Sequence, residues 1–366
     1  YIYMSLFLFI VLLVVLILVH EFGHFSVAKF FGIRVDEFGI FFPPRLFAFK
    51  RGETEYSFNA LRFGGFVKIF GESAKEDGVQ TDPRSLVRKP RLVQAAVIVA
   101  GVVFNILFAW LALSAGYMHG LPTAAGSAVV GQVEDARTTV LGVLPDSPAA
   151  KAGLQAQDVV VAAQTGTAQI QEGATSDELR AFIAAHQEES VLLTVMRGEE
   201  EKTFLAKPAE GLVAGQKALG VSLDDVGQLQ LPVHLALVQG AVLAYHMTVG
   251  TAVGLGGFFY SIVTGTANWG GVAGPIGIAG IGASAVQDGL VATIILMSLI
   301  SVNLAIINLL PIPGLDGGRL LFIVIEAIIR RPISEKLSLR LTIAGFALLI
   351  GLMVVVSFHD IARLVG

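Results

Sequence analysis

The sequence has 366 residues, of which 54% are hydrophobic and only 15% are charged, and its mean hydropathy is +0.73. Soluble globular proteins are usually about 45–50% apolar and about 25% charged, so this composition predicts a membrane protein. The net charge of −4 argues against nucleic acid as the main partner. The sequence contains no cysteine, which excludes a disulfide framework and a zinc site built from thiolates.

Four stretches are apolar over the roughly 20 residues that a helix needs to cross a bilayer. They are residues 1–24, 92–118, 290–310 and 341–358. A further apolar stretch, Leu320–Ile329, is too short to cross, and we expect a helix there that enters the membrane only in part. The predicted fold class is therefore an α-helical polytopic membrane protein with four transmembrane helices.

Positive charge indicates the orientation of these spans. Residues 25–91 contain twelve Lys and Arg and residues 317–340 contain five, whereas residues 116–289 contain seven Lys and Arg against sixteen Asp and Glu. Loops rich in Lys and Arg stay on the cytoplasmic side, although a segment as long as 116–289 crosses largely regardless of its charge. This pattern places both termini and residues 120–289 outside the cytoplasm.

Residues 233–265 are apolar enough to form another span, but six glycines interrupt them. A single crossing here would reverse the direction of the 290–310 span and put Asp316 on the opposite face from His20. We expect these two residues to meet, as argued below. We therefore predict that residues 233–265 form helices that lie on or dip into the outer membrane face. A re-entrant pair of helices would preserve the same arrangement and stays open.

The motif His20-Glu21-Phe22-Gly23-His24 stands at the end of the first apolar stretch. Helical residues four apart lie on one face, about 6 Å from each other. The two imidazoles can therefore bind one zinc ion, with Glu21 beside them to hold a water and take its proton. The alternative is a helix end with two interfacial histidines. Ionisable residues inside a spanning helix are costly and usually functional, which favours the zinc site.

A catalytic zinc site needs a third protein ligand and keeps a fourth position for water. Asp316 follows the 290–310 span, which runs towards the same side as the first span, so Asp316 lies near the depth of His20. An Asp-Gly turn at a helix end is the structural alternative for Asp316. Glu326 is the competing carboxylate, although its helix position favours a paired residue. The remaining histidines are single residues in loops or at span ends: His119, His186, His234, His246 and His359.

Residues 55–70 alternate polar with apolar side chains on both sides of a glycine pair. The alternation predicts two strands, Glu55–Leu61 and Phe66–Phe70, with a turn at Gly64-Gly65. A strand edge could pair with a substrate segment that has lost its helical hydrogen bonds, since unpaired backbone groups in lipid cost several kcal/mol each. A surface hairpin without a role in substrate binding is the alternative.

Three asparagines lie at membrane depth. Asn105 and Asn303 are typical of hydrogen bonds between helices. Asn308 differs, because Pro311 and Pro313 break the helix just beyond it, and broken helix at membrane depth is tolerated where it lines a cavity. We therefore expect the Asn308 amide to reach a substrate backbone or a developing oxyanion.

Residues 127–222 are richer in charged and polar residues than their surroundings. Ser147-Pro148-Ala149 is typical of a helix start, Gly153-Leu154 leads towards a strand at Asp158-Val159-Val160, and a second helix is predicted over Thr175–His186. This pattern resembles the PDZ domains of bacterial proteases. Such domains bind extended peptides or carboxy-termini by strand addition. A steric filter against substrates with bulky outer domains is the alternative.

The motifs together resemble the site-2 protease family of intramembrane zinc metalloproteases, and more narrowly its bacterial regulator-of-sigma-E protease type. The resemblance covers nearly the whole chain. It rests on HEFGH in the first span, Asn303 and Asn308 through Leu315-Asp316-Gly317 around the third, Gly64-Gly65-Phe66-Val67-Lys68, and Gly274-Pro275-Ile276. This chain has room for one PDZ domain, whereas the best-known Gram-negative member has two. The substrate and its pathway therefore stay open.

The resemblance implies one zinc ion per chain and regulated cleavage of single-span membrane proteins, such as anti-sigma factors or remnant signal peptides, in the bacterial cytoplasmic (inner) membrane. The lipid bilayer is the other implied partner, and a peptide or carboxy-terminus at the PDZ domain a further one. The implied site residues are the zinc ligands His20, His24 and Asp316, the general base Glu21 and, in contact with substrate, Asn303, Asn308, Pro311, Gly64 and Gly65.

The sequence thus predicts four regions. Residues 1–126 carry two spans, HExxH and a membrane-dipping hairpin; residues 127–222 form an inserted extracytoplasmic α+β PDZ domain; residues 223–289 form membrane-surface or re-entrant helices; and residues 290–366 carry two spans and Leu315-Asp316-Gly317. The predicted function is an intramembrane zinc metalloendopeptidase. One alternative is a membrane-anchored PDZ adaptor with a vestigial metal site, against which the intact Glu21 argues. Another is a metal transporter, which would usually carry ionisable residues on several spans.

Overall fold

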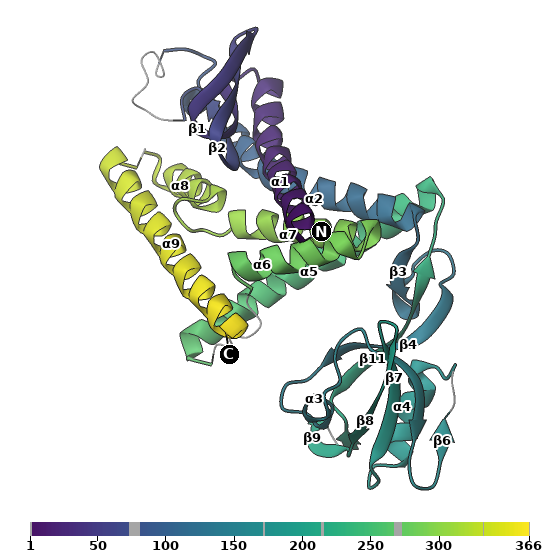
Figure 1. The fold of residues 1–366 in the computed structure, drawn as a ribbon. Coiled ribbons are helices and arrows are strands. Elements are labelled where there is room, and N and C mark those ends of the chain that lie inside the picture. Colours follow the sequence, from purple (N-terminus) through teal and green to yellow (C-terminus); the bar gives the residue numbers. More distant parts are fainter. Residues whose placement is uncertain are drawn as a thin grey trace. The chain divides into compact units, whose positions relative to one another are not determined.

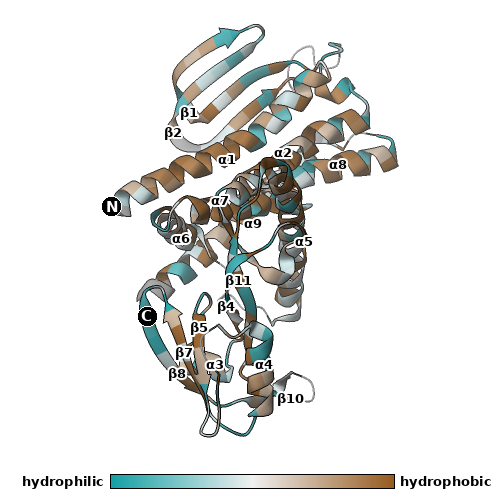
Figure 2. Ribbon diagram, turned by 90° about the vertical axis from the view of Figure 1, so that its right-hand side faces the viewer, coloured by the Kyte–Doolittle hydropathy of each residue, from teal (hydrophilic) through white to brown (hydrophobic). Residues whose placement is uncertain are grey.

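The structure is a computed structural model that describes residues 2–72, 81–170, 173–213, 216–266, 273–331 and 333–365 (Figure 1). The chain divides into two compact units, Tyr1–Gly116 with Gly240–Gly366, and Tyr117–Gln239. Long helices dominate the first unit, and a seven-stranded sheet dominates the second. Apolar residues cover the helices of the first unit, and hydrophilic residues are more frequent in the second (Figure 2).

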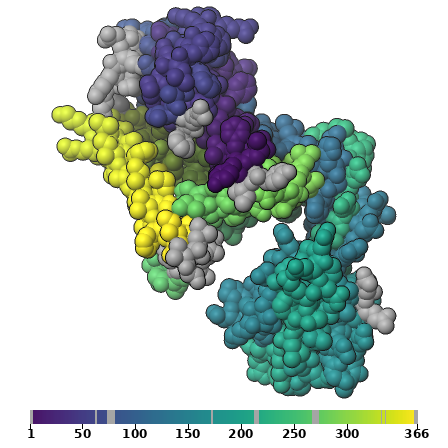
Figure 3. Space-filling view, in the orientation of Figure 1, coloured from purple at the N-terminus to yellow at the C-terminus, as the bar shows by residue number. Residues whose placement is uncertain are grey.

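Helices supply most of the first unit. Five helices among the described residues are long and apolar enough to cross a membrane, one more than the four expected. They are α1 (Ile2–Phe30), α2 (Arg91–Met118), α5 (Val233–Thr264), α7 (Leu290–Asn308) and α9 (Glu335–Val365). Two shorter helices, α6 (Pro275–Gln287) and α8 (Asp316–Ile329), complete the set, with a short 3₁₀ turn at Leu86–Arg88. Many side chains of α9 are exposed, and this helix lies at the periphery of the unit (Figure 3).

The α5 helix corrects the expectation for residues 233–265. It is one continuous helix of 32 residues, about 48 Å long, so the predicted break into several helices, and with it the re-entrant pair, is wrong. Each glycine costs about 0.5–1 kcal/mol relative to alanine in a helix. A helix of this apolar composition tolerates that cost, because it keeps its backbone hydrogen bonds internal where other partners are scarce.

Glycines mark the points where the helices of the first unit approach each other closely. A Cβ atom at Gly23 of α1 would lie 2.6 Å from the Ala100 carbonyl oxygen of α2. A Cβ at Gly282 of α6 would lie 2.3 Å from the Phe9 ring of α1. Small residues allow such close backbone contacts, which drive helix packing where water is absent. The metal motif of α1 is therefore held against α2, and the opposite half of α1 against α6.

A β-sheet lies beside the end of α1. β1 (Val35–Arg51) and β2 (Thr54–Ile69) form a long antiparallel hairpin that reverses at Gly52, a glycine with φ +64°. Residues 35–40 pair with residues 55–58 on one side and with residues 65–69 on the other. Residues 65–67 therefore lie at an edge of the sheet, where the described strands pair with them through residues 38–40.

The expected turn at Gly64-Gly65 is wrong, because both glycines lie inside β2. Gly64 has φ +76°, and a Cβ atom there would lie 2.5 Å from the Phe42 ring. Glycine is needed at this position for a bend in the strand and for close contact with an aromatic ring. The partner strand, β1, was not anticipated.

The second unit is a sheet packed against two helices. Its strand order is β3-β11-β4-β5-β7-β8, with β6 beside β5, and β9 pairs separately with β10. The strands are β3 (Leu121–Ala124), β4 (Glu134–Val143), β5 (Val159–Gln164), β6 (Gln169–Ile170), β7 (Val191–Arg197), β8 (Glu200–Ala206), β9 (Ala209–Val213), β10 (Gln216–Ala218) and β11 (Val221–Leu229). A 3₁₀ turn spans Ala125–Ser127. The buried core includes Val140, Leu179 and Leu193.

Both helices predicted in the second unit are present. α3 (Pro148–Ala152) begins after Ser147, whose side chain accepts a hydrogen bond from the Ala150 N–H, and ends at Gly153 with φ +94°. α4 (Ser176–Ala185) begins after Thr175 with a capping box. These caps satisfy backbone donors that a helix start leaves free.

Candidate metal centre

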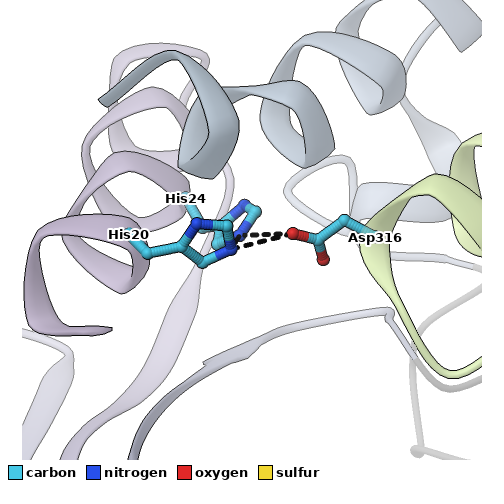
Figure 4. A group of neighbouring side chains, drawn as sticks. All are labelled: His20, His24 and Asp316. Carbon is cyan, nitrogen blue, oxygen red and sulfur yellow. Dashed lines mark hydrogen bonds and ion pairs between the residues drawn. The ribbon is translucent and has the colours of Figure 1, made fainter. Parts of the chain in front are cut away.

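Three side chains from distant parts of the chain converge in the first unit: His20, His24 and Asp316 (Figure 4). The two Nε2 atoms lie 3.2 Å apart. Asp316 Oδ2 lies 2.9 Å from Nε2 of His20 and 3.3 Å from Nε2 of His24. This is the one such group of potential metal ligands among the described residues, so it contains none of the other five histidines.

Helical spacing explains how α1 presents its two imidazoles. His20 and His24 lie one turn apart, and their rings meet edge to face with centroids 4.8 Å apart. Both residues are buried, with exposed fractions of 6% and 8%. Buried imidazoles with their Nε2 atoms turned towards each other would compete for one proton, which is the arrangement expected of metal ligands rather than of surface residues.

Two glycines allow Asp316 to reach the histidines. Asp316 is the first residue of α8, and Gly317 and Gly318 follow it. A Cβ atom at Gly317 would lie 2.2 Å from the carbonyl oxygens of Leu309 and Leu310, and one at Gly318 would lie 2.3 Å from that of Ile312. Only glycine fits so closely under the preceding loop. The Asp-Gly-Gly sequence therefore brings the start of α8 against the chain that leaves α7.

The α2 helix supports the histidines from the other side. His24 Nδ1 lies 2.8 Å from the Val97 carbonyl oxygen, so Nδ1 donates its hydrogen there and leaves the Nε2 lone pair free. A Cβ atom at Gly101 would lie 2.4 Å from Nε2 of His24 and 2.7 Å from Nε2 of His20. A glycine is therefore required where α2 passes the site, a requirement that the sequence pattern did not reveal.

Asn105 holds the second imidazole. Its side chain is fully buried, its Nδ2 atom lies 3.2 Å from His20 Nδ1, and its Oδ1 atom has no hydrogen-bond partner. Amide oxygen and nitrogen positions are assignments from the hydrogen-bond network. The exchanged amide lets His20 Nδ1–H donate to Oδ1, satisfies the unpaired oxygen and frees Nε2, as metal-binding histidines require. Asn105, expected only to bridge helices, contacts a potential metal ligand, His20.

The donor atoms fit zinc. Zinc binds histidine nitrogen and carboxylate oxygen at about 2.0–2.2 Å in a tetrahedron, whose edges would then measure about 3.3–3.6 Å. The three distances between His20 Nε2, His24 Nε2 and Asp316 Oδ2 are 2.9, 3.2 and 3.3 Å. Two imidazoles and a carboxylate also form a donor set typical of catalytic zinc sites, with a fourth position left for water.

A cavity of about 150 Å³ opens beside these donors. Glu21, His24 and Asp316 line it together with Phe66, Val67 and Ile69 of β2. The Val67 backbone N–H hydrogen-bonds the Glu21 carboxylate, and the Glu21 Cγ atom lies 3.6 Å from the position of a Cβ on Gly65. The edge of the sheet and the potential metal ligands therefore line one cavity.

The remaining predicted residues lie in different settings. Asn303 and Asn308 are half-buried on α7 and Pro311 is exposed, and none of them lines this cavity. Glu326, the competing carboxylate, pairs with Arg91 of α2 at 2.7 Å and is absent from the ligand cluster. Arg319 also lines the cavity and forms an ion pair with Glu72; the sequence patterns pointed to neither residue.

The family model for peptidase family M50 matches residues 8–352. The chain belongs to peptidase family M50. This is the site-2 protease family, so the protein is a multi-pass membrane protein and a zinc metalloprotease. The resemblance seen in the motifs is thereby confirmed.

Relatives of similar length agree with this assignment. The chain is 35% identical over 376 residues to a candidate zinc metalloprotease of Nostoc sp., covering 99% of this chain and 97% of the relative. It is also 35% identical to a candidate zinc metalloprotease of Clostridium perfringens, over 94% of this chain and 95% of the relative. It is 26% identical to the zinc metalloprotease RasP of Oceanobacillus iheyensis, over 97% and 98%.

Proposed function

We propose that this M50 peptidase is an intramembrane endopeptidase that cuts single-span membrane proteins, with zinc bound by His20, His24 and Asp316 and with Glu21 as the general base. One observation carries the proposal. The only potential metal cluster among the described residues shares its cavity with the Glu21 carboxylate and with the strand edge at Phe66 and Val67.

Each residue has a task in this reaction. Bound zinc would polarise the scissile carbonyl and lower the pKa of a water towards about 7. Glu21 takes a proton from the attacking water and passes it to the leaving amine nitrogen. Asn105 and the Val97 carbonyl keep the Nε2 atoms of His20 and His24 directed at the metal. In this proposal the rate of cleavage therefore depends on two residues of α2, Asn105 and Val97, that orient the two imidazoles.

The edge of β2 is the proposed binding place for substrate backbone. A substrate helix must unwind before its carbonyl groups can be attacked, and each unpaired group costs several kcal/mol in lipid. Residues 65–67 can supply replacement hydrogen bonds by strand addition, beside Glu21. In this proposal Gly64 and Gly65 shape that edge. Asn303 and Asn308 of α7, and Pro311 in the segment that follows α7, bind the substrate further along.

We also propose that α5 lies along the outer membrane face, so that four helices cross. Near its start, Gly240 of α5 contacts Ser114 near the end of α2. The next described helix, α6, begins after Gly274, whose N–H hydrogen-bonds Asp360 near the end of α9. If α2 and α9 both run outwards, these contacts lie on the outer side. The termini and the second unit are then extracytoplasmic. The membrane in this proposal is the bacterial inner membrane.

The second unit is proposed to be a PDZ domain. Its support is the predicted pair of capped helices, α3 and α4, on an antiparallel sheet, together with an open groove between α4 and β11. In this proposal the domain is inserted in the sequence between the helices α2 and α5, and it meets the parts of partner proteins that project from the membrane.

The test of the catalytic proposal is Glu21→Gln. The variant should keep one zinc per chain but lose cleavage of a co-expressed single-span reporter, because it retains the ligands and lacks the base. Glu326→Gln is the matched control, since this carboxylate lies outside the cluster, and it should keep both properties. Cleavage at the wild-type rate by Glu21→Gln would refute the proposed base.

A further inference from the structure

Arg319 is the one side chain in the described lining of the metal-site cavity that has hydrogen-bond donors to spare. The other polar side chains of that lining are Glu21, His24, Glu72 and Asp316. Ionised carboxylates only accept hydrogen bonds, and His24 already donates through Nδ1 to the Val97 carbonyl. The described lining is therefore rich in acceptors, and Arg319 is its single Lys or Arg residue.

Arg319 uses one end of its guanidinium to bind Glu72. Its Nη1 atom pairs with a Glu72 carboxylate oxygen, and the guanidinium has no further hydrogen bond to a described residue. A guanidinium carries five N–H donors in a rigid planar fork, so Nε and Nη2 remain available. The side chain lines the cavity and is also 49% exposed, which places these donors where another molecule can reach them.

The backbone holds both partners near the metal centre. Arg319 lies three residues after Asp316 on α8, so the two side chains leave the same face of the helix. Glu72 follows the end of β2, where its N–H donates to the Ile69 carbonyl at 3.1 Å. The ion pair thus joins the start of α8 to the end of the strand, and the Glu21 carboxylate is close enough to attract the guanidinium.

The proposed hydrolysis creates a negative charge that needs such donors. The water oxygen bonds to the scissile carbonyl carbon, the water proton passes to Glu21, and the second electron pair of the C=O bond moves to the carbonyl oxygen. When the C–N bond breaks, the oxygen returns its pair to the C=O bond, and the nitrogen keeps the C–N pair and takes the proton from Glu21. The oxyanion between these steps is stabilised by donors aimed at it, in addition to any bound metal. Asn308, which was expected to supply one, does not line this cavity.

We propose that Arg319 is a further catalytic residue, whose unoccupied guanidinium N–H groups stabilise this oxyanion, and that Glu72 is a positioning residue that holds the guanidinium at the cavity. The inference rests on the proposed function, because it requires that the peptide bond is attacked in this cavity. A purely structural ion pair is the alternative. Pairs with a half-exposed partner contribute little to stability, which argues against it.

The first measurement is the steady-state kinetics of the full chain with zinc in detergent micelles, acting on the purified single-span reporter. Arg319→Ala should lower kcat about 10²–10³-fold, the usual loss for one oxyanion donor. KM should change by less than about threefold, because the contact forms only in the transition state. Glu72→Gln keeps the guanidinium and should lower kcat by no more than about tenfold. The two partners of a purely structural pair would instead give equal losses.

Two controls separate chemistry from folding. Arg84 is also 49% exposed and pairs with Glu53, outside the cavity, so Arg84→Ala should keep the wild-type kcat. Millimolar guanidinium ion should raise the kcat of Arg319→Ala by at least about tenfold, because it supplies the same planar donors in the vacated space. A misfolded variant could not respond in this way, and all variants should keep one zinc per chain.

Binding of a transition-state analogue gives a readout that does not depend on turnover. The cut in the reporter is mapped, and a labelled peptide that spans it carries an anionic phosphinic group in place of the scissile amide. In fluorescence anisotropy, Arg319→Ala should weaken binding of this analogue about 10²–10³-fold, in line with the loss of kcat. The unmodified peptide is measured in Glu21→Gln, which should not cleave it, and adding Arg319→Ala should change its affinity by less than about twofold.

Three results would overturn the inference. Arg319→Ala could keep the wild-type kcat. It could lose no more activity than Glu72→Gln. Finally, it could weaken the unmodified peptide as much as the phosphinic peptide, which would make Arg319 a general binding contact. In all three cases the wild type still cuts the reporter and the proposed function stands, whereas a wild type that does not cut it would overturn both.

Discussion

The packing at Gly101 gives the sharpest quantitative prediction for the metal centre. Gly101→Ala places a Cβ atom 2.4 Å from Nε2 of His24 and 2.7 Å from Nε2 of His20. Non-bonded atoms prefer about 3.5 Å, so the rings or α2 must move by about 1 Å. Zinc sites tolerate ligand distances within only about 0.2 Å. We therefore expect zinc affinity to fall at least 10–100-fold, about 1.4–2.7 kcal/mol.

The assay is chelator competition on purified chain, with the zinc content per chain measured directly. Gly250→Ala is the matched control, because Gly250 is a glycine in a long apolar helix with open space at its Cβ position. It should keep wild-type affinity and gain about 0.5–1 kcal/mol of stability from reduced backbone freedom. Wild-type zinc affinity in Gly101→Ala would refute the assignment of the two histidines as ligands.

The other predictions concern neighbouring parts of the structure. Asn105→Leu should lower zinc affinity about 10–100-fold in the same assay, because it leaves His20 Nδ1 without an acceptor; an unchanged affinity would contradict the proposed amide orientation. Gly317→Ala should abolish both zinc binding and reporter cleavage, because a Cβ atom there meets two carbonyl oxygens at 2.2 Å; retained cleavage would contradict the packing argument. Arg197→Ala should destabilise the second unit by about 3–5 kcal/mol in denaturant unfolding, because the buried Asp158 carboxylate loses partners at 2.7 and 2.8 Å. Burial raises the pKa of Asp158, but hydrogen bonds from Arg197 and the Gln155 N–H outweigh this and hold that pKa below its usual value. The contribution of this pair is therefore present above about pH 4 and lost as the pH falls further, and unfolding of Asp158→Asn should lack this acid dependence.

The parts of the site that follow from local geometry could be predicted from the sequence. The spacing of His20 and His24 determines their common helix face, and the predicted ligand group is the one that meets in the structure. Asp316 was predicted as the acidic residue just after the third span, and its expected meeting with His20 was the premise that set the direction of that span. Glu326 was expected to be a paired residue, and it is.

The parts that depend on contacts between elements could not be predicted in the same way. Gly101 and Asn105 belong to the site because of how α2 is rotated about its axis and how far it is shifted along α1. The sequence of α2 alone does not reveal this placement. Gly64-Gly65 indicated a turn, because glycine pairs are typical of turns; the constraint is instead the Phe42 ring on the other strand. The α5 helix shows that glycines can also be overweighted as helix breakers. The free-energy cost of its glycines is too small to end the helix, so it stays continuous.

The proposed zinc ligands are separated by most of the chain, because Asp316 follows His20 by 296 positions. A ribosome delivers α1 to the membrane long before it delivers α8. During synthesis the two histidines are therefore in the membrane before Asp316 has been made, and the nascent chain cannot assemble the proposed three-ligand centre. A membrane-embedded protease built this way remains inert until its last third has been inserted, so that a truncated or misinserted product carries no competent site among its neighbours in the bilayer.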